Sequence, residues 1–430
     1  MRWSAMRGAA CAMGLAAVCG LSHAQKGEVV KIAVIDPLSG MAAVTGSNQL
    51  KTAQFYAEIL NRSRGSGPRY EILGLDNKLD AKESVVQVQK AIDAGARFIT
   101  QGNGSAVAAA ISEAVARHNE QNPGKEVVYV NQAGIDPALT NEKCNYWHFR
   151  VDADVSMRME AVSAFIKDRP DIHKVYLLNQ NYSFGQQVAR YARERIKAQR
   201  PDVQIVGDEL IPLAQVRDFA PHVARIKASG ADTVITGNWG TDLSLLAKAS
   251  VDGGYAGRFI TFYGGMAGTP QAFGASGLGR VYVVSATHNN MGGMADLLFQ
   301  RFKREYKEDM QSFQVIYSLM LINEGILKAH STDPVKVAAA MEGLTFQGFN
   351  GDMQVRRQDH QTQQAMFLLV MGKSSVKYPN GLEGTDYTMI PEKRYDAHVA
   401  STPTSCQMAR PSSMATAPAA AASRARAHSS

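Results

Sequence analysis

The chain has 430 residues, 45% hydrophobic and 20% charged, which is typical of a folded globular protein with two domains of ordinary size. Its formal net charge of +7 comes largely from the two ends, since residues 1–24 carry two arginines and residues 401–430 carry three, all without acids. The remaining chain has a net charge of only +2, which argues against a nucleic-acid partner.

The first 24 residues have the layout of a secretory signal peptide. Arg2 and Arg7 precede an apolar run over Cys11–Leu21, and small residues stand at Ser22 and Ala24. Because the run is too short to span a bilayer, we expect cleavage near Ala24 and a soluble, exported protein in the periplasm.

Four cysteines are present, two of them within the expected signal peptide. Cys19 follows Val18 instead of a small residue, which disfavours lipidation without excluding it. Cys144 has no cysteine partner inside the expected folded region, whereas Cys406 lies in the tail. We therefore expect a buried free thiol at Cys144, with a Cys144–Cys406 bridge as the less favoured alternative.

Strand-like and helix-like patterns then alternate along the first half of the chain. Apolar runs typical of strands lie at Val29–Ile35, Tyr70–Leu75, Arg97–Thr100 and Glu126–Val130. Helical patterns lie between them at Ser47–Asn61, Ala81–Ala94 and Ser105–Asn119. This alternation predicts a parallel sheet covered by helices on both faces.

The same alternation restarts after residue 150. Strands are expected at Lys174–Asn179, Val203–Leu210, Thr233–Thr236, Phe259–Tyr263 and Val281–Ser285. Helices are expected at Ser156–Asp168, Phe184–Ala198, Asp218–Ser229 and Leu243–Val251. Three more helices are expected at Ala295–Asp309, Ser312–His330 and Pro334–Met341. Two last strands are expected at Met353–Arg357 and Ala365–Met371.

These patterns predict an α/β protein with two doubly wound parallel-sheet lobes, joined by a hinge that several crossings of the chain form. Lobe 1 is expected over residues 25–150 and about 290–342, and lobe 2 over residues 151–289 and about 343–395. Residues 396–430 are rich in Ala, Ser and Pro. We expect them to be disordered, because they cannot bury enough apolar surface.

The segment Gln101–Ser105 is the sharpest candidate for ligand binding, because ligands of doubly wound sheets bind beyond the carboxyl ends of strands. Gly102 and Gly104 let the backbone approach a ligand closely. We expect Ser105 to cap the following helix, to hold a carboxylate or phosphate at its free N–H groups, or to do both. A dinucleotide site is a poor fit, since Val107 stands where a third glycine is needed.

Aromatic and acidic residues lie in other loops of this kind. Trp239 follows a strand between glycines, and we expect it to cover a ligand. Phe184 and Tyr263 have similar positions, with an ordinary core role as the alternative. Asp152 and Asp154 lie near the expected crossing between lobes, where helix capping or exposure to solvent is favoured over contact with a ligand ammonium group.

Enzyme motifs are absent from the sequence. It contains no Gly-x-Ser-x-Gly elbow, no Walker loop and no histidine pair at zinc-binding spacing. We therefore expect no cofactor and no metal, and a periplasmic enzyme is the less favoured interpretation.

Five segments carry a family resemblance: Ile35–Gly40, Gln101–Ser105, Asn131–Thr140, Tyr182–Gln186 and Gly237–Gly240. In this order the chain resembles the periplasmic solute-binding proteins of branched-chain amino acid ABC transporters. This leucine/isoleucine/valine-binding family has the type I periplasmic binding fold. The resemblance covers about residues 29–387. It implies two lobes that close on a solute and dock on an inner-membrane permease.

The resemblance also implies ligand-binding positions. It places Ser105 at a serine that holds the ligand carboxylate, and Ile135 at a threonine whose hydroxyl isoleucine cannot supply. Phe184, Trp239 and Thr45 fall at aromatic positions of the family. Together with the loop analysis, the expected ligand-binding residues are Thr45, Asn103, Gly104, Ser105, Ala133, Gly134, Ile135, Phe184, Trp239 and Tyr263.

Gly264 falls where the family has a glutamate that pairs with the α-ammonium group of the ligand. A buried ammonium without a counter-charge costs several kcal/mol. We therefore hypothesise a carboxylate solute without an amino group, either aromatic or aliphatic. An amino acid stays open if Asp152 or Asp154 supplies the missing charge.

The leading interpretation is a monomeric receptor of an ABC importer that captures a small carboxylate-bearing solute, either a branched-chain amino acid or a related organic acid. The alternative is a periplasmic sensor partner that presents a ligand to a membrane receptor. A transcription regulator of related fold is disfavoured by the signal peptide and by the lack of an N-terminal helix-turn-helix.

Overall fold

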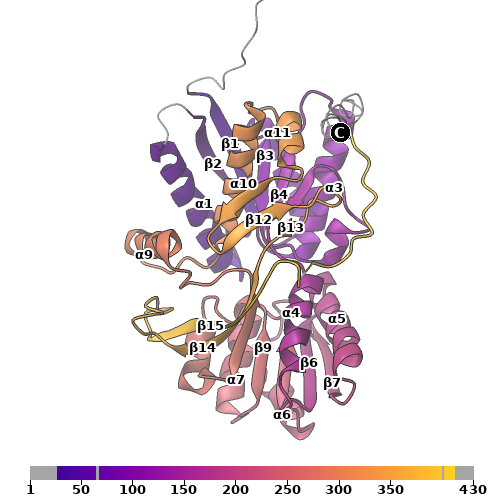
Figure 1. Cartoon of the computed structure of the whole chain (residues 1–430), viewed down its shortest axis with the longest axis vertical. Coiled ribbons are helices and arrows are strands. Elements are labelled where there is room, and N and C mark those ends of the chain that lie inside the picture. The colour runs from indigo at the N-terminus through magenta and orange to yellow at the C-terminus, as the bar shows by residue number, and fades with distance from the viewer. Residues whose placement is uncertain (1–26, 64–66, 400, 412–430) are drawn as a thin grey trace, which may run out of the picture.

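The structure is a computed structural model that describes residues 27–63, 67–399 and 401–411, and it shows two α/β lobes, one above the other (Figure 1). The expected signal peptide with Cys19 and the end of the tail lie outside the described residues. Among the helices that the structure describes, none combines enough length and apolarity to cross a membrane.

Lobe 1 is built on a five-stranded parallel sheet. Its strands are β1 (Val29–Asp36), β2 (Arg69–Asp76), β3 (Phe98–Gln101), β4 (Val128–Asn131) and β5 (His148–Arg150), in the order β2-β1-β3-β4-β5. Its helices are α1 (Ala43–Ser63), α2 (Ala81–Asp93), α3 (Ser105–Gln121), the 3-10 helix η1 (Pro137–Thr140), α10 (Gln314–Ala329) and α11 (Pro334–Met341). Successive β1 residues Ile32, Ala33 and Val34 are all fully buried, because side chains on both faces of the sheet are covered.

Lobe 2 is built on a seven-stranded sheet in the order β15-β14-β10-β9-β8-β6-β7. The parallel strands are β6 (Lys174–Gln180), β7 (Gln204–Ile211), β8 (Thr233–Thr236), β9 (Arg258–Thr261) and β10 (Val281–Ser285); β14 (Met366–Lys373) and β15 (Tyr387–Tyr395) add antiparallel pairs at one edge. The helices are α4 (Val155–Lys167), α5 (Ser183–Gln199), α6 (Ala220–Ala228), α7 (Gly240–Asp252), α8 (Thr269–Phe273) and the 3-10 helix η2 (Gly274–Gly277). Neighbours such as Leu177 and Leu178 belong to separate apolar cores on the two faces of this sheet.

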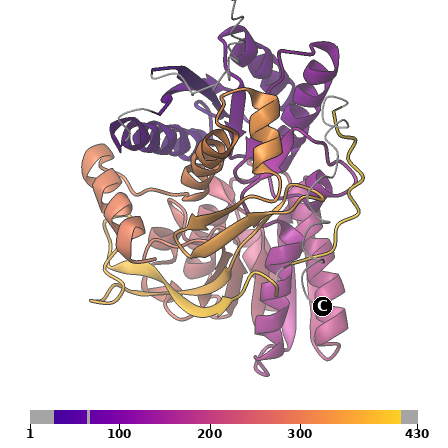
Figure 2. The ribbon, with the colours of Figure 1, turned by 45° about the horizontal axis from the view of Figure 1, so that its top comes forward.

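A small antiparallel sheet of β11 (Thr345–Gly348), β12 (Gly351–Val355) and β13 (Thr362–Gln363) lies near the junction of the lobes in both ribbon views (Figures 1 and 2). Residues from 343 on were expected in lobe 2, but Phe346 and Met353 belong to the core of lobe 1. The helix α9 (Gly293–Tyr306) also lies at the junction, where Phe302 packs edge-on against Phe55 of α1.

The tail departs from two expectations. Cys144 and Cys406 form a disulfide, so the expectation of a free thiol at Cys144 is wrong. The expected disorder from residue 396 on is also wrong for residues 401–411, which contact lobe 1. Thr404, for example, donates a hydrogen bond to the Thr140 carbonyl at 2.9 Å. The physical reason is that a covalent bridge and polar contacts order this segment, and Met408 also packs against the core of lobe 1.

Candidate functional site

The loop between β3 and α3 forms one corner of a cavity between the lobes. The N-cap residue of α3 is Gly104, at φ 81°, and Ser105 is the first helical residue. The interpretation of Ser105 as the helix cap is therefore wrong. Its hydroxyl instead accepts a hydrogen bond from the Asp136 N–H at 3.2 Å. Among the described residues the Ser105 hydroxyl proton has no acceptor, and the first N–H groups of a helix lack intrahelical partners, so this corner offers donors to an anion.

A buried carboxyl group forms hydrogen bonds that fix the position of this loop. Asp36, at the end of β1, accepts hydrogen bonds from the Gly102 N–H at 3.0 Å and from Asn103 Nδ2 at 3.1 Å. Asn103 Nδ2 also donates to Gln49 Oε1 of α1 at 2.7 Å. Burial raises the pKa of Asp36 to about 7, against the opposing effect of these hydrogen bonds. The loop is thus positioned by side chains from β1 and α1.

Aromatic side chains from lobe 2 form the opposite wall. Tyr182 and Trp239 immediately precede α5 and α7, and the Trp239 indole N–H donates to the Tyr182 hydroxyl at 2.8 Å. The Phe184 ring lies 5.8 Å from that of Phe262 and 5.9 Å from that of Tyr263. These residues meet because β6, β8 and β9 are neighbours in the sheet and end at the same edge.

Asp152 and Arg158 are the only charged side chains in the described lining. His288 also lines the cavity, but burial lowers its pKa to about 4, so its imidazole is neutral near pH 7. Asp152 lies in the hinge crossing, Arg158 lies in the first turns of α4, and both are almost fully buried. Arg158 donates to Asp152 Oδ2 at 2.6 Å and also to the carbonyl of Val284 at 3.0 Å. Burial raises the pKa of Asp152, and Arg158 opposes this effect. The two opposite charges therefore largely neutralise each other within the wall of the cavity.

The cavity has a volume of about 120 Å³. It extends across lobe 2 from Trp239, after β8, to Met389 in β15. In the sheet order β8-β9-β10-β14-β15 these two strands are four intervals apart, which corresponds to roughly 19 Å. Its far end is lined by apolar side chains that all belong to one core on the lobe 2 sheet: Val283, Met310, Phe313, Leu369, Leu382 and Met389. The cavity therefore has a donor-rich corner, a neutralised ion pair and an apolar end.

Seven of the ten expected ligand-binding residues line this cavity: Asn103, Gly104, Ser105, Ala133, Phe184, Trp239 and Tyr263. Thr45, Gly134 and Ile135 do not. Ile135 is 1% exposed and packs in an apolar core, and a Cβ atom at Gly134 would meet the Ala108 side chain at 2.4 Å. Of the two acids, Asp152 lines the cavity, whereas Asp154 caps α4 and pairs with Arg150 at 3.0 Å.

Gly264 does not line the cavity. A Cβ atom there would lie 2.4 Å from Thr261 Oγ1 and 3.1 Å from Val283 Cγ2, so a side chain at this position would point into the sheet. Gly265 and Met266 line the cavity instead. Asp152 is therefore the only carboxylate among the described lining residues.

Several lining residues were missed by the sequence analysis, among them Gln49, Arg158, the segment 310–314 and Leu369. Arg158 had a usable signal, because helical spacing places it on the same face of α4 as the apolar residues Val155 and Val162. The others lie far apart in the chain, and nothing local to them marks a shared site.

Two α/β lobes, seen in Figure 2, both contribute residues to the lining of one cavity, an arrangement typical of a two-lobed solute-binding protein. The periplasmic binding protein family matches residues 29–375, and the chain belongs to this family. It is 32% identical over 420 residues to the Leu/Ile/Val-binding protein homolog 4 of Brucella abortus, covering 94% of this chain and 98% of the relative. The predicted resemblance to the branched-chain amino acid type is thereby confirmed.

Solved structures agree with the fold. The chain is similar to the closed conformation of the leucine-, isoleucine-, valine-, threonine- and alanine-binding protein of Brucella ovis. The TM-score is 0.80 and the identity 30%, with 90% of this chain and all of that chain covered. A solute-binding protein of an ABC transporter from R. palustris, solved with 4-hydroxybenzoate, has a TM-score of 0.72 at 18% identity, with 86% of this chain and 98% of that chain covered. The prediction of a type I periplasmic binding fold is confirmed, and the chain is a periplasmic solute-binding protein of the ABC-transporter type.

Proposed function

We propose that this protein captures a small monocarboxylate without an α-amino group and delivers it, as a monomer, to an inner-membrane ABC permease. The observation that carries this proposal is the charge pattern of the cavity. Donors converge at Ser105 and the start of α3, while Asp152, the only carboxylate that the described part of the chain places in the lining, is already paired with Arg158 at 2.6 Å. A carboxylate would gain the donors, whereas an ammonium group would have to share Asp152 with an arginine.

The apolar end of the cavity supports a further proposal, about the part of the solute that carries the carboxylate. Met310, Leu369 and Met389 are each at most 3% exposed and carry no charge. Methionine side chains adapt to irregular shapes, so this end suits an aliphatic or aromatic body. One chain supplies residues from both lobes to the cavity, which supports action as a monomer.

A branched-chain amino acid is the second candidate. Asp152 lines the cavity and lies within the reach of a bound solute, and the relatives from Brucella are named for leucine, isoleucine and valine binding. In this case Asp152 would accept the α-ammonium group while keeping its contact with Arg158.

A thermal-shift comparison of matched ligands separates the two candidates. L-leucine and 4-methylpentanoate share a carbon skeleton and differ only in the amino group, so we expect the acid to raise the melting temperature more than the amino acid does. A ligand at one hundred times its Kd stabilises the folded state by about 2.7 kcal/mol. Strong stabilisation by L-leucine and none by 4-methylpentanoate or phenylacetate would favour the second candidate.

The Ser105→Leu variant tests the anion corner with whichever ligand gives the larger shift. We expect it to lose at least tenfold in affinity, because a bulky apolar side chain removes the hydroxyl and fills the space in front of the helix terminus. Ser112→Leu is the matched control, since Ser112 is a buried residue of the same helix that does not line the cavity. Isothermal titration of both variants, with circular dichroism as a check on folding, measures the effect. Unchanged affinity in Ser105→Leu would refute the proposed corner.

Trp239 provides an optical readout of solute binding. It lines the cavity at 8% exposure, whereas Trp147 belongs to the core of lobe 1. We expect saturating solute to shift the emission of a Trp147→Phe variant and to leave that of a Trp239→Phe variant unchanged. The same response in both variants would contradict the contact of Trp239 with the solute.

A further inference from the structure

The segment 401–411, here called the strap, is fastened to lobe 1. Cys406 is bonded to Cys144 in the loop before β5, and Thr404 donates to the Thr140 carbonyl at the end of η1. Further along, Arg410 forms an ion pair of 2.5 Å with Glu342. Figure 1 shows this part of the chain running along the side of lobe 1. The strap follows β15, a strand of the lobe 2 sheet, so it is one more crossing between the lobes.

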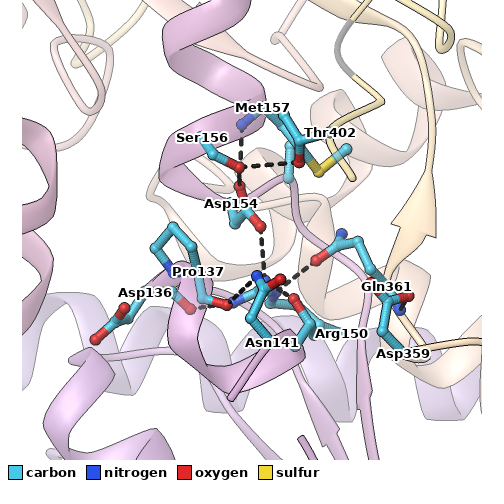
Figure 3. Close-up of polar contacts among 12 residues, drawn as sticks. Asp136, Pro137, Asn141, Arg150, Asp154, Ser156, Met157, Asp359, Gln361 and Thr402 are labelled. Atoms are coloured by element: carbon cyan, nitrogen blue, oxygen red, sulfur yellow. Dashed lines mark hydrogen bonds and ion pairs between the residues drawn. The ribbon is translucent and has the colours of Figure 1, made fainter. Parts of the chain in front are cut away.

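The strap also contacts lobe 2 at the hinge. The hydroxyl oxygens of Thr402 and Ser156 lie 3.0 Å apart, and Ser156 donates its proton to Asp154 Oδ1 at 2.6 Å. Thr402 must therefore donate to Ser156. Asp154 in turn pairs with Arg150, which lies at the end of β5 directly before the chain crosses to lobe 2 (Figure 3). A hydrogen-bond chain thus joins the strap to the hinge.

A polar crevice lies between the two lobes where the strap runs. It is lined by Pro137 and Asn141 of lobe 1, Gln187 and Tyr191 of lobe 2, and Thr402 and Ser405 of the strap. Movement of the lobes changes the distance between the two walls of this crevice. The strap is in contact with both walls, so it cannot stay bound to both when they separate.

The length of the strap determines how strongly it can act. Four Cα–Cα steps lead from Thr402 to Cys406 and reach about 14 Å when fully extended, whereas the eleven steps from Tyr395 to Cys406 reach about 38 Å. The tether is therefore shortest while the contact between Thr402 and Ser156 holds and the disulfide is formed. Without the disulfide, only non-covalent contacts such as that of Thr404 with Thr140 fasten the strap to lobe 1, and these break more easily.

We infer that the strap is a redox-sensitive tether that favours the closed arrangement of the lobes. The disulfide fixes one end on lobe 1, and the hydrogen bond from Thr402 to Ser156 holds the strap against lobe 2. Both contacts are present in a structure that is similar to a closed binding protein, at a TM-score of 0.80. Contacts that exist in only one of two states shift the population toward that state. A dithiol reductant supplies two electrons and two protons, becomes a disulfide itself and leaves Cys144 and Cys406 as two thiols. This reduction of the bridge therefore raises the population of the open state, whichever solute the cavity takes.

Two matched variants test the tether in the solute-free, oxidised protein. Thr402→Val removes the hydrogen bond to lobe 2, and Thr404→Val removes one to lobe 1 but leaves the disulfide as the anchor. Small-angle X-ray scattering reports the radius of gyration, and hydrogen exchange reports opening at the start of α4. We expect Thr402→Val to increase the radius and to speed exchange there roughly fivefold or more, while Thr404→Val behaves like the parent protein. Equal behaviour of the two variants, changed or unchanged, would overturn the inference.

Reduction provides the second arm of the test. Dithiothreitol is expected to increase the radius of the parent protein, and the Cys144→Ser/Cys406→Ser double variant is expected to have the larger radius with or without reductant. A lower melting temperature with an unchanged radius and unchanged exchange at α4 would show a merely structural disulfide and would overturn the inference.

Discussion

Replacing Cys406 by serine is expected to lower the free energy of unfolding by about 2 to 5 kcal/mol. The bridge joins residues 262 positions apart, so its loss restores a large amount of chain entropy to the unfolded state. Loss of the bridge also weakens the attachment of the strap to lobe 1, because the polar contacts that remain bury little apolar surface. This weakening adds to the loss of stability. Urea denaturation, followed by circular dichroism under oxidising conditions, measures the change.

A double-mutant cycle provides the control for this prediction. Cys144→Ser, Cys406→Ser and the double variant should lose similar amounts of stability, because each of them removes the same covalent bond. Additive losses from the two single variants, or a parent protein whose denaturation midpoint does not respond to reductant, would contradict the presence of the bridge in solution.

The Asp36→Asn variant is expected to change how stability depends on pH. Burial raises the pKa of Asp36 to about 7, whereas an aspartate in the unfolded chain has its ordinary pKa of 3.8. The folded state therefore keeps a proton that the unfolded state releases between about pH 4 and pH 7. The stability that this proton contributes is fully present below pH 4 and is lost as the pH rises to 7.

The size of this change follows from the separation of the two pKa values, at about 1.4 kcal/mol per pH unit. The stability of the parent protein relative to Asp36→Asn should fall by on the order of 4 kcal/mol between pH 4 and pH 8. Asparagine keeps an acceptor for the Gly102 N–H but cannot ionise, so the titration of other groups cancels in the difference. Urea midpoints of both proteins over this pH range test the prediction, and a difference that does not vary with pH would refute it.

The predicted strands agree best with the structure where local patterns were strong. The expected run Thr233–Thr236 coincides with β8, and Val281–Ser285 coincides with β10, because short apolar runs between glycines and helices are typical of buried parallel strands. β15 was missed, since an edge strand with Pro391 and three charged residues lacks that pattern. The strands β5, β11 and β13 gave little signal because they have only three, four and two residues, too few for a period of two to be recognised.

The candidate site was predictable on one side of the cavity. The corner at Ser105 was visible because a glycine-rich loop between a strand and a helix lies at the carboxyl edge of the sheet. The partner of Asp152 and the apolar end near Leu369 and Met389 were not visible. They depend on how lobe 2, the 310–314 segment and the edge strands pack together.

Local residue patterns were thus enough for the alternation of strands and helices, the division into two lobes and the donor-rich loop, because hydrophobic periodicity and turn chemistry act over a few residues. The neutralised charge in the cavity, the orientation of Gly264 into the sheet and the disulfide to the tail depend on contacts across hundreds of residues. Such contacts form only when the free energy of packing in the folded chain offsets the entropy lost in closing long loops. A short stretch of neighbouring residues does not contain the information needed to compare these two quantities.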